Sequence, residues 1–279
     1  MAISGTNSTT LDDLFVNIVA QARFTAEEQS LMLGLVTQYN IAGQAGKTVQ
    51  IPKYPAITAA ALDEGTAPAD TDVSTSSVTV TCAEVGNSVL LTDLAAMGAG
   101  NPADELGTVL GNAIATKIDK DLIALFSGFS GALGAAGAEL AVSDLFKAAA
   151  TLRANKVTGS MAAVVHPFQA YQLKANLTNT FANPNGGDLQ NEAMRSGYVG
   201  SIAGIDVYES ANVAIDGSDD AVAAVFAPEA LAIALKSEFN LETQRNATRR
   251  GTELVATAVY GVAELDDSYG VKITADAAL

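Results

Sequence analysis

The chain has 279 residues and 49% of them are hydrophobic, which is enough to build a sizeable core and excludes a disordered protein. Its formal net charge of −16 gives a surface that repels phosphate, so a nucleic-acid-binding protein is not expected. A single cysteine cannot form an intrachain disulfide. One cysteine and one histidine also cannot supply the usual ligands of a structural metal ion.

The N-terminal segment is expected to begin with a flexible polar arm over residues 1–10 and to continue with two short helices. Apolar residues at helical spacing predict the first helix around residues 11–19, and Thr25 with Glu28 forms a capping box before a second helix at 26–36. No basic stretch precedes an apolar run, and no uncharged apolar run reaches membrane-spanning length. Neither a secretory signal nor a membrane segment is therefore expected.

Two strands joined by a long acidic connection are predicted next. Alternation of apolar and polar residues predicts strands over residues 47–54 and 78–91, and Cys82 should pack on one strand face as a small hydrophobic residue. The connection between the strands holds little that can be buried and contains no lysine or arginine. Such a hairpin tip is either a mobile loop or an arm that reaches another subunit, and the sequence leaves both open.

The most clearly bounded element is a long helix. Asn101 can cap its start, Pro102 suits the first helical position, and Gly128 can end it in a left-handed conformation. The face expected to point inward consists of Leu106, Val109, Leu110, Ala113, Ile114, Ile118, Leu122, Leu125 and Phe126. The opposite side, expected to be solvated, consists of Glu105, Thr108, Asn112, Thr116 and Asp119. Lys117 and Asp121 lie four residues apart and can form an ion pair.

The Gly- and Ala-rich stretch 128–137 is interpreted as a hinge, and beyond it helices alternate with strands as in an α/β-like domain. Ser143 should cap a helix whose buried face consists of Leu145, Phe146, Ala149 and Leu152. A buried strand is predicted at Met161–Val165, and Pro167 should open a second helix with the apolar positions Phe168, Tyr171 and Leu173. Residues 177–197 are too polar to pack and are predicted to form a long loop.

Several further strands are predicted in the last third of the chain. A tight hairpin should turn at Ala203 and Gly204, because glycine supplies the positive φ that such a turn needs. The strands that follow should cover residues 222–226, 231–235, 254–260 and 271–273. We expect the first two of these to be short and to join one sheet, and the third to be the longest strand of the chain.

No residue pattern for catalysis is present. His166 stands at a strand end and is interpreted as structural rather than as a base, and no serine or cysteine lies in a nucleophile motif. The adjacent acidic pairs lack calcium-loop spacing and are expected in turns or caps: Asp12 with Asp13, Asp63 with Glu64, Asp219 with Asp220 and Asp266 with Asp267. The basic cluster of Arg245, Arg249 and Arg250 is too small for a nucleic-acid site and is expected to pair with acidic neighbours. No enzyme, cofactor or metal is predicted.

The order of these parts resembles that of the major capsid proteins of tailed bacteriophages, which have the Hong Kong 97-like fold. The resemblance is carried by the long helix with KIDKD at 117–121 running to Gly128, by VVHP at 164–167 leading into Tyr171 and Leu173, and by GSIAGIDVYES at 200–210. The closing VYGV at 259–262 and VKI at 271–273 also look like C-terminal strands of this family. The resemblance implies an α+β fold with an N-terminal arm (1–40), an extended hairpin (41–91), a peripheral domain with the spine helix (92–139 and 236–279) and an axial domain (140–235).

The function that this resemblance implies is mechanical. Copies of the chain would form hexamers and pentamers that close an icosahedral shell around a phage double-stranded DNA genome, without sequence-specific DNA binding. The location would be the virion capsid, assembled in the host cytoplasm. The sequence shows no long N-terminal extension of the kind that some relatives use as a built-in scaffold, so a separate scaffolding protein is expected. A portal and a decoration protein are further candidate partners.

The same resemblance suggests where copies of the chain meet. Candidate subunit contacts are Asp63, Glu64, Asp70 and Asp72 on the hairpin tip and Arg245, Arg249 and Arg250 near the C-terminus. Some relatives join subunits covalently through a lysine and an asparagine. Lys53 lies near the hairpin, but nothing in the sequence identifies its partner, so non-covalent shells are predicted.

Alternatives to a phage capsid stay open in the sequence. An encapsulin-type nanocompartment is similar in fold but encloses enzymes inside a cell; a cargo peptide would identify it, whereas a portal and terminase would identify a phage. A secreted adhesin would suit an acidic chain rich in Ala, Gly and Thr, but the mid-chain helices and the missing signal peptide argue against it. An unrecognised hydrolase is the weakest alternative.

Overall fold

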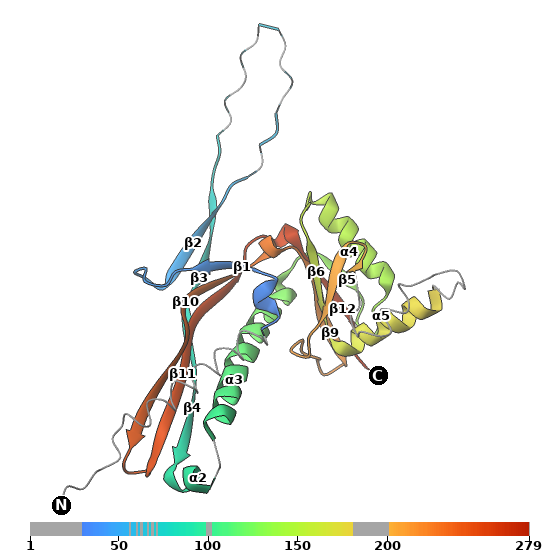
Figure 1. Ribbon diagram of the computed structural model, residues 1–279. Helices are drawn as coiled ribbons and strands as arrows, with labels where there is room; N and C mark the ends of the chain where they lie inside the picture. Colours follow the sequence, from blue (N-terminus) through green and yellow to red (C-terminus); the bar gives the residue numbers. More distant parts are fainter. Residues whose placement is uncertain are drawn as a thin grey trace, which may run out of the picture.

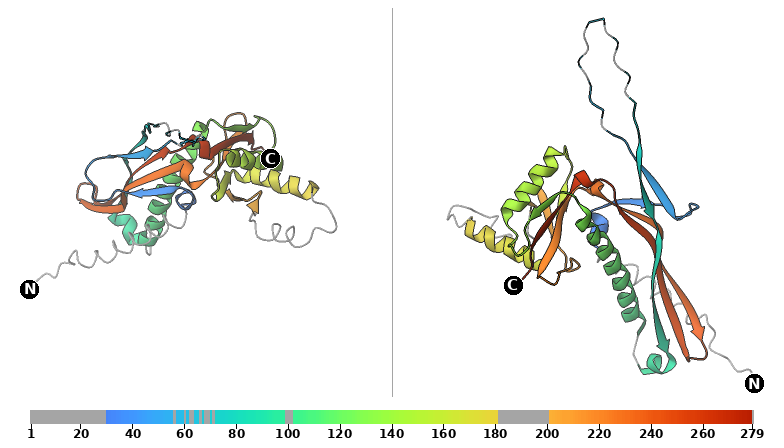
Figure 2. Two further views of the ribbon diagram at one scale, coloured as in Figure 1. Left: turned by 90° about the horizontal axis from the view of Figure 1, so that it is seen from above. Right: turned by 180° about the vertical axis from the view of Figure 1, so that it is seen from behind.

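The computed structural model describes residues 30–98, except positions 56, 60, 62, 63, 66, 68, 69 and 71, and then residues 102–180 and 201–278. Two bodies lie side by side, each built on one sheet, and a two-stranded arm projects from the first body (Figure 1). Figure 2 shows the same arrangement from above and from behind. The predicted helix at 11–19, the capping box of Thr25 and Glu28, the Asn101 cap and most of the predicted 177–197 loop lie outside the described residues. The described part of the helix predicted at 26–36 is not α-helical: only residues 32–34 are helical, as a 3₁₀ turn, and a strand follows at 37–40.

The first body is a four-stranded sheet with a long helix along one face. The strand order is β1-β10-β11-β4, with β1 parallel to β10 and the other neighbours antiparallel. The strands are β1 (Thr37–Asn40), β10 (Leu231–Asn246), β11 (Gly251–Glu264) and β4 (Ala83–Thr92). The helices are η1 (Met32–Gly34), α2 (Asp93–Gly98), α3 (Pro102–Ala124) and η2 (Leu125–Gly128). Leu110 of α3 packs against Leu254 and Ala256 of β11, which holds the helix on the sheet.

Helix α3 is the predicted spine helix, but it does not end as predicted. Pro102 is its first residue, and the chain tightens at Leu125 into the 3₁₀ turn η2 instead of stopping at a left-handed Gly128. This turn carries Phe126 and Phe129 into the core, where both rings are fully buried and their centroids lie 6.4 Å apart. Aromatic burial, rather than glycine conformation, therefore sets the end of the helix.

The predicted inward face of α3 is correct for most residues and wrong for two positions. The buried residues include Leu110, Ile114, Ile118, Leu122 and Phe126. Val109, expected inward, is exposed, and Asp119, expected in solvent, is only 1% exposed because the segment 30–36 packs against that side of the helix. Helical periodicity depends only on neighbouring residues, so it cannot predict that a segment distant in sequence packs against one side of the helix. Lys117 and Asp121 form the predicted ion pair, at 2.5 Å.

The arm is the predicted hairpin. Strand β2 (Thr48–Lys53) pairs in antiparallel fashion with β3 (Ser76–Thr81), and the register places Ile51 opposite Val78. The strand pair and the described residues beyond it extend away from both bodies (Figure 1). At its base β3 leads into β4 past Cys82, which is buried against Ile41, Val80 and Ala234, as expected for a small hydrophobic residue.

The second body is a six-stranded sheet with two helices on one face. The strand order is β5-β12-β9-β6-β8-β7. The strands are β5 (Ala132–Gly134), β12 (Gly270–Asp276), β9 (Asp220–Phe226), β6 (Met161–Val165), β8 (Ile205–Glu209) and β7 (Ser201–Ile202), and the helices are α4 (Val142–Ala154) and α5 (Pro167–Thr180). The predicted turn between β7 and β8 is confirmed, with φ of 58° at Ala203 and 81° at Gly204.

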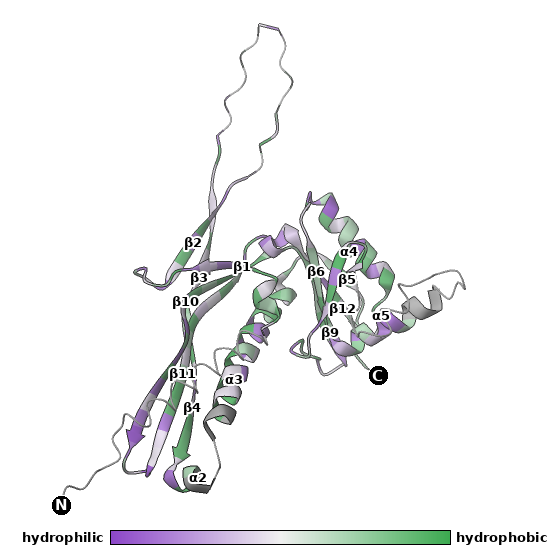
Figure 3. Ribbon diagram, viewed as in Figure 1, coloured by the Kyte–Doolittle hydropathy of each residue, from purple (hydrophilic) through white to green (hydrophobic). Residues whose placement is uncertain are grey.

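The six-stranded sheet is buried on both faces, because α4 and α5 cover one face and the C-terminal end of α3 with η2 packs against the other. Alternate residues of β9 show this: Ala223 and Val225 pack in the cluster with α4 and α5, whereas Ala224 and Phe226 pack in the cluster with α3 and η2. The central strand β9 is accordingly hydrophobic along most of its length (Figure 3). The layers are thus α4 with α5, the six-stranded sheet, α3, and the four-stranded sheet.

Two connections between the bodies overturn part of the predicted strand grouping. The 3₁₀ turn η3 (Pro228–Ala230) carries the chain from β9 into β10 in the other sheet, so these strands do not share a sheet. Strand β10 has 16 residues and is longer than β11, which has 14. The turn η4 (Asp267–Tyr269) leads from β11 back to β12 in the six-stranded sheet. Residues 231–235 and 270–276 therefore lie in the opposite sheet from the one that their expected domains imply.

The stretch 128–137 is also different from the predicted hinge. Its residues Ala132–Gly134 form β5, which pairs in parallel with β12, and Phe129 is buried in the core. Strand pairing and aromatic burial thus order a stretch that its glycines alone would leave free.

Helix α4 differs from the prediction in its cap and in one buried position. Ser143 lies inside the helix, Ala141 is the N-cap residue, and Phe146 is exposed rather than buried.

Helix α5 begins at Pro167 as predicted, but its buried face is partly polar. Tyr171, expected inward, is exposed, whereas Gln169 and Gln172 are buried. The amide of Gln169 donates to the carbonyl oxygens of Ala221 (2.9 Å) and Ala275 (3.0 Å), and its Oε1 accepts from the His166 backbone N–H at 3.2 Å. A glutamine with all these partners can be buried, and a polarity pattern cannot reveal them.

Candidate functional site

The described part of the chain holds no arrangement for catalysis or metal binding. It contains no group of three or more His, Cys, Asp and Glu residues that could hold a metal ion. His166 is buried, its Nδ1 accepts from the Phe168 N–H at 3.2 Å at the start of α5, and burial lowers its pKa. This confirms the interpretation of His166 as a helix-start residue. In the same described residues, no helix is long and apolar enough to cross a membrane.

The arm presents apolar side chains to solvent. Tyr54 is 71% exposed, and Ile57 and Val73 are also exposed. Exposed large apolar residues gathered on one projecting element mark an interaction surface. The acidic residues of the same connection that the structure describes, Glu64, Asp70 and Asp72, are exposed as well, while Asp63 lies outside the described residues. The arm therefore combines apolar contact area with negative charge.

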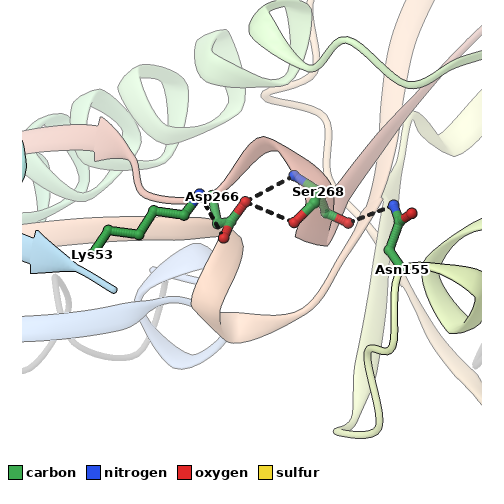
Figure 4. A network of polar contacts seen from close by, with 4 residues as sticks. All are labelled: Lys53, Asn155, Asp266 and Ser268. Carbon is green, nitrogen blue, oxygen red and sulfur yellow. Dashed lines mark hydrogen bonds and ion pairs between the residues drawn. The ribbon is translucent and has the colours of Figure 1, made fainter. Parts of the chain in front are cut away.

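The base of the arm is held to the connection between the two bodies. Lys53, at the end of β2, pairs with Asp266 at 2.7 Å, and Asp266 Oδ1 accepts from the N–H (3.1 Å) and the hydroxyl (2.7 Å) of Ser268. Asn155, just after α4, donates to the Ser268 carbonyl oxygen at 2.9 Å. Figure 4 shows this chain of contacts running from the arm to the second body. Burial raises the pKa of Asp266, but the hydrogen bonds from Lys53 and Ser268 lower it by more, so the net shift is downward.

A shallow groove accompanies this contact. Its volume is about 200 Å³, and its lining includes Ile51, Pro52 and Val78 from the arm and Leu265 and Tyr269 from the connection. The sequence did not identify Asp266 as the neighbour of Lys53, because the two residues meet only once β2 is placed beside the β11–β12 turn. The expectation that Asp266 and Asp267 lie in a turn or cap is confirmed, since Asp266 caps η4.

The three arginines predicted to cluster do so at the end of the first body opposite the arm. Arg245 of β10 makes two hydrogen bonds to Asp93 of α2, at 2.6 and 2.8 Å, which confirms the expected ion pair. The hydrogen bond from Arg245 lowers the pKa of Asp93, and the same contact raises the pKa of Arg245. Arg249 and Arg250 are exposed in the β10–β11 turn, beside which Leu94 is 82% exposed.

The acidic and the basic candidate residues therefore lie at opposite ends of the first body (Figure 1). The structure brings Arg245, Arg249 and Arg250 together at the β10–β11 turn, and the arm of the same chain projects from the opposite end of the first body. Both ends also expose apolar side chains, Tyr54 on the arm and Leu94 on α2. The two ends therefore carry side chains of opposite charge.

Comparisons with known proteins concern the family of the chain and its fold. A family model described as phage capsid protein matches residues 77–273. The fold is similar to the capsid of the cyanophage P-SCSP1u (TM-score 0.73, 17% identity, 88% of each chain covered). It is also similar to the capsid of the Helicobacter pylori bacteriophage KHP30 (TM-score 0.71, 14% identity, 88% of this chain and 91% of that chain). A virus-like particle from Pyrococcus furiosus matches with a TM-score of 0.63 and 10% identity, over 93% of this chain and 98% of that chain. No curated protein sequence matches the chain.

Proposed function

The chain belongs to the phage capsid protein family, and on this premise we propose that its copies form hexamers and pentamers that close an icosahedral shell around double-stranded DNA. The family match and the fold by themselves show that the chain is a capsid shell protein of the Hong Kong 97-like fold. It is a structural protein of the virion capsid and not an enzyme. Assembly in the host cytoplasm, with a scaffolding protein, a portal and a decoration protein as partners, belongs to the proposal.

The arm is the observation that carries the proposal. The hairpin leaves large parts of Tyr54, Ile57 and Val73 exposed, so these side chains offer apolar area to a neighbouring molecule. Burying such side chains against a neighbour contributes roughly 1.5–3 kcal/mol each, which favours association between copies. The net charge of −16 also suits a shell wall, because packaged DNA is then enclosed without binding tightly to it.

For the contact between copies, the proposal pairs the acidic arm of one subunit with the basic end of the next. Glu64, Asp70 and Asp72, with Asp63, would face Arg249 and Arg250, while Arg245 stays paired with Asp93 of its own chain. The division into an arm, a hairpin, a peripheral domain and an axial domain is part of the same proposal. In it, the first body corresponds to the peripheral domain and the second to the axial domain, except that residues 231–235 belong to the first body and residues 270–276 to the second.

Electron microscopy of the purified chain, alone and then with candidate scaffolding proteins, tests the shell. Closed icosahedral particles, or rings of five and six subunits, are expected. A chain that stays monomeric under every condition would contradict the proposal. Because the fold is also similar to a virus-like particle, an encapsulin-type shell is the second candidate. A cargo peptide in purified shells would favour it, and a copurifying portal would favour the phage capsid.

A charge exchange tests the subunit contact separately. Asp70→Lys with Asp72→Lys should abolish closed shells, and so should Arg249→Glu with Arg250→Glu, because each places like charges together. Combining the four changes should restore shells at least in part. Glu139→Lys changes an exposed acid on the second body and should leave assembly unchanged. If the combined variant remains unassembled while the control assembles, the contact is wrong and the shell proposal still stands.

A further inference from the structure

A buried carboxylate lies near the C-terminal end of the spine helix, where three segments of the chain meet. Asp119 Oδ1 accepts from the Ser30 hydroxyl at 3.0 Å and from the Met32 N–H at 3.2 Å, and its Oδ2 accepts from the Leu31 N–H at 3.3 Å. The nearby side chain of Asn212, in the turn after β8, also helps to lower the pKa of this carboxyl group. Burial raises the pKa of Asp119, and these hydrogen bonds oppose the rise by stabilising the charged form.

The chemistry of a carboxylate suits this position. At the start of η1, the N–H groups of Leu31 and Met32 have no partner within the helix itself. The N-cap residue is Leu31, whose side chain makes no capping hydrogen bond. Asp119 provides the missing acceptors from another helix. An ionised carboxylate only accepts hydrogen bonds, whereas an asparagine of the same shape would turn an NH₂ group toward at least one of these donors. The site therefore requires Asp rather than Asn.

Apolar contacts form around the same point. Met32 and Val36 from the N-terminal segment pack in one cluster with Ile118 and Leu122 of α3 and with Val213 from the turn after β8. The N-terminal segment then continues into β1, which pairs with β10. The turn that holds Asn212 and Val213 belongs to the second body. One carboxylate thus lies where the spine helix, the N-terminal segment and the second body meet.

We propose that Asp119 is a latch that docks the segment 30–36 and the turn 210–213 on the spine helix together, so that loss of one docking loosens the other. The latch also ties the position of the second body to that of the N-terminal segment. The latch itself follows from the contacts of the single chain, and only its consequence for shell assembly rests on the proposed function.

Hydrogen exchange of the unassembled chain, read by mass spectrometry on overlapping peptides, tests the latch. Asp119→Asn should accelerate exchange at Leu31 and Met32 by about 10- to 100-fold, the equivalent of losing hydrogen bonds to a charged group. Because the docking is shared, Asn212 and Val213 should accelerate as well. Peptides from the buried strand β6 should not change, which shows that the fold is intact. Lys120→Gln, at the exposed residue next to Asp119 on the same helix, should leave both regions unchanged.

The outcomes decide between the latch and a local contact. Faster exchange only at Leu31 and Met32 would overturn the shared docking, and no acceleration at either region would overturn the latch altogether. If Asp119→Asn also opens β6, Ser30→Ala decides, because it removes one hydroxyl donor and keeps the carboxylate. That variant must then accelerate both regions by a smaller factor, or the proposal fails. Shell formation is scored separately, so a wild-type chain that forms no shells counts against the proposed function and not against the latch.

Discussion

Replacing Gly270 with alanine should destabilise the unassembled subunit strongly, because a buried ring lies against this glycine. Gly270 begins β12, and a Cβ added there would lie 2.2 Å from Cε1 and 2.3 Å from Cζ of Phe129. Carbon atoms in contact normally lie about 3.5–4.0 Å apart, so the ring would have to move by more than about 1 Å. Phe129 is fully buried and stacks with Phe126, which leaves it little room to move.

The expected loss lies at the upper end of the usual range for overpacking, about 3 kcal/mol. For a domain of this size such a loss lowers the melting temperature by roughly 6–12 °C. Thermal and urea unfolding of the subunit measure it. Gly159→Ala is the matched control, since a Cβ at Gly159 meets nothing within 4 Å, and it should change stability little.

A double-mutant cycle decides whether the ring is the cause. Phe129→Leu shortens the side chain that meets the new methyl group, so Gly270→Ala combined with Phe129→Leu should lose less stability than the two separate losses predict. Strictly additive losses, or a Gly270→Ala variant as stable as Gly159→Ala, would refute the reasoning. Either result would show that Gly270 of β12 and the ring of Phe129 lie farther apart than in the structure.

Two further predictions concern the acidic turn between the bodies. Burial, and then the nearby Asp267 and Asp266 carboxylates, raise the pKa of Glu264 above its ordinary value of 4.5. A group whose pKa is raised in the folded state contributes stability that is fully present below its ordinary pKa and is lost as the pH rises through the raised pKa. Glu264→Gln should therefore be more stable than the wild type at neutral pH, and this difference should disappear below pH 4.5. Urea unfolding across this pH range measures the difference, and an advantage that persists in acid would contradict the assignment. Because Lys53 is already paired with Asp266, shells should be non-covalent and give a single monomer band on a denaturing gel; a ladder of linked subunits would overturn this.

Much of the fold could be predicted from local sequence signals. Pro102 and Pro167 begin helices, Ala203 and Gly204 form the tight turn, and alternation locates the strands of the arm. These features depend on the conformational preferences of neighbouring residues, which act the same way wherever the segment lies. The candidate contacts were also visible as charge patterns, because acidic and basic residues gather in separate stretches of the chain.

The errors share one cause. The local pattern predicts Asp119 in solvent, Phe146 and Tyr171 in the core, and β9 and β10 in one sheet, because each of these inferences uses only nearby residues. The actual outcome depends on which distant segment arrives. Residues 30–36 cover Asp119, for example, and no neighbouring segment of the described chain covers Tyr171.

The sequence by itself determined most of the helices and strands, the acidic composition, the long spine helix and the absence of a catalytic residue pattern, but not the turn η1 or the strands β1 and β5. The tertiary structure alone decided which strands share a sheet, which acid meets Lys53, and that Asp119 is buried at the meeting point of three segments. The physical reason is that local preferences act between residues close in sequence. Burial and hydrogen-bond satisfaction, in contrast, depend on contacts between residues far apart in the chain.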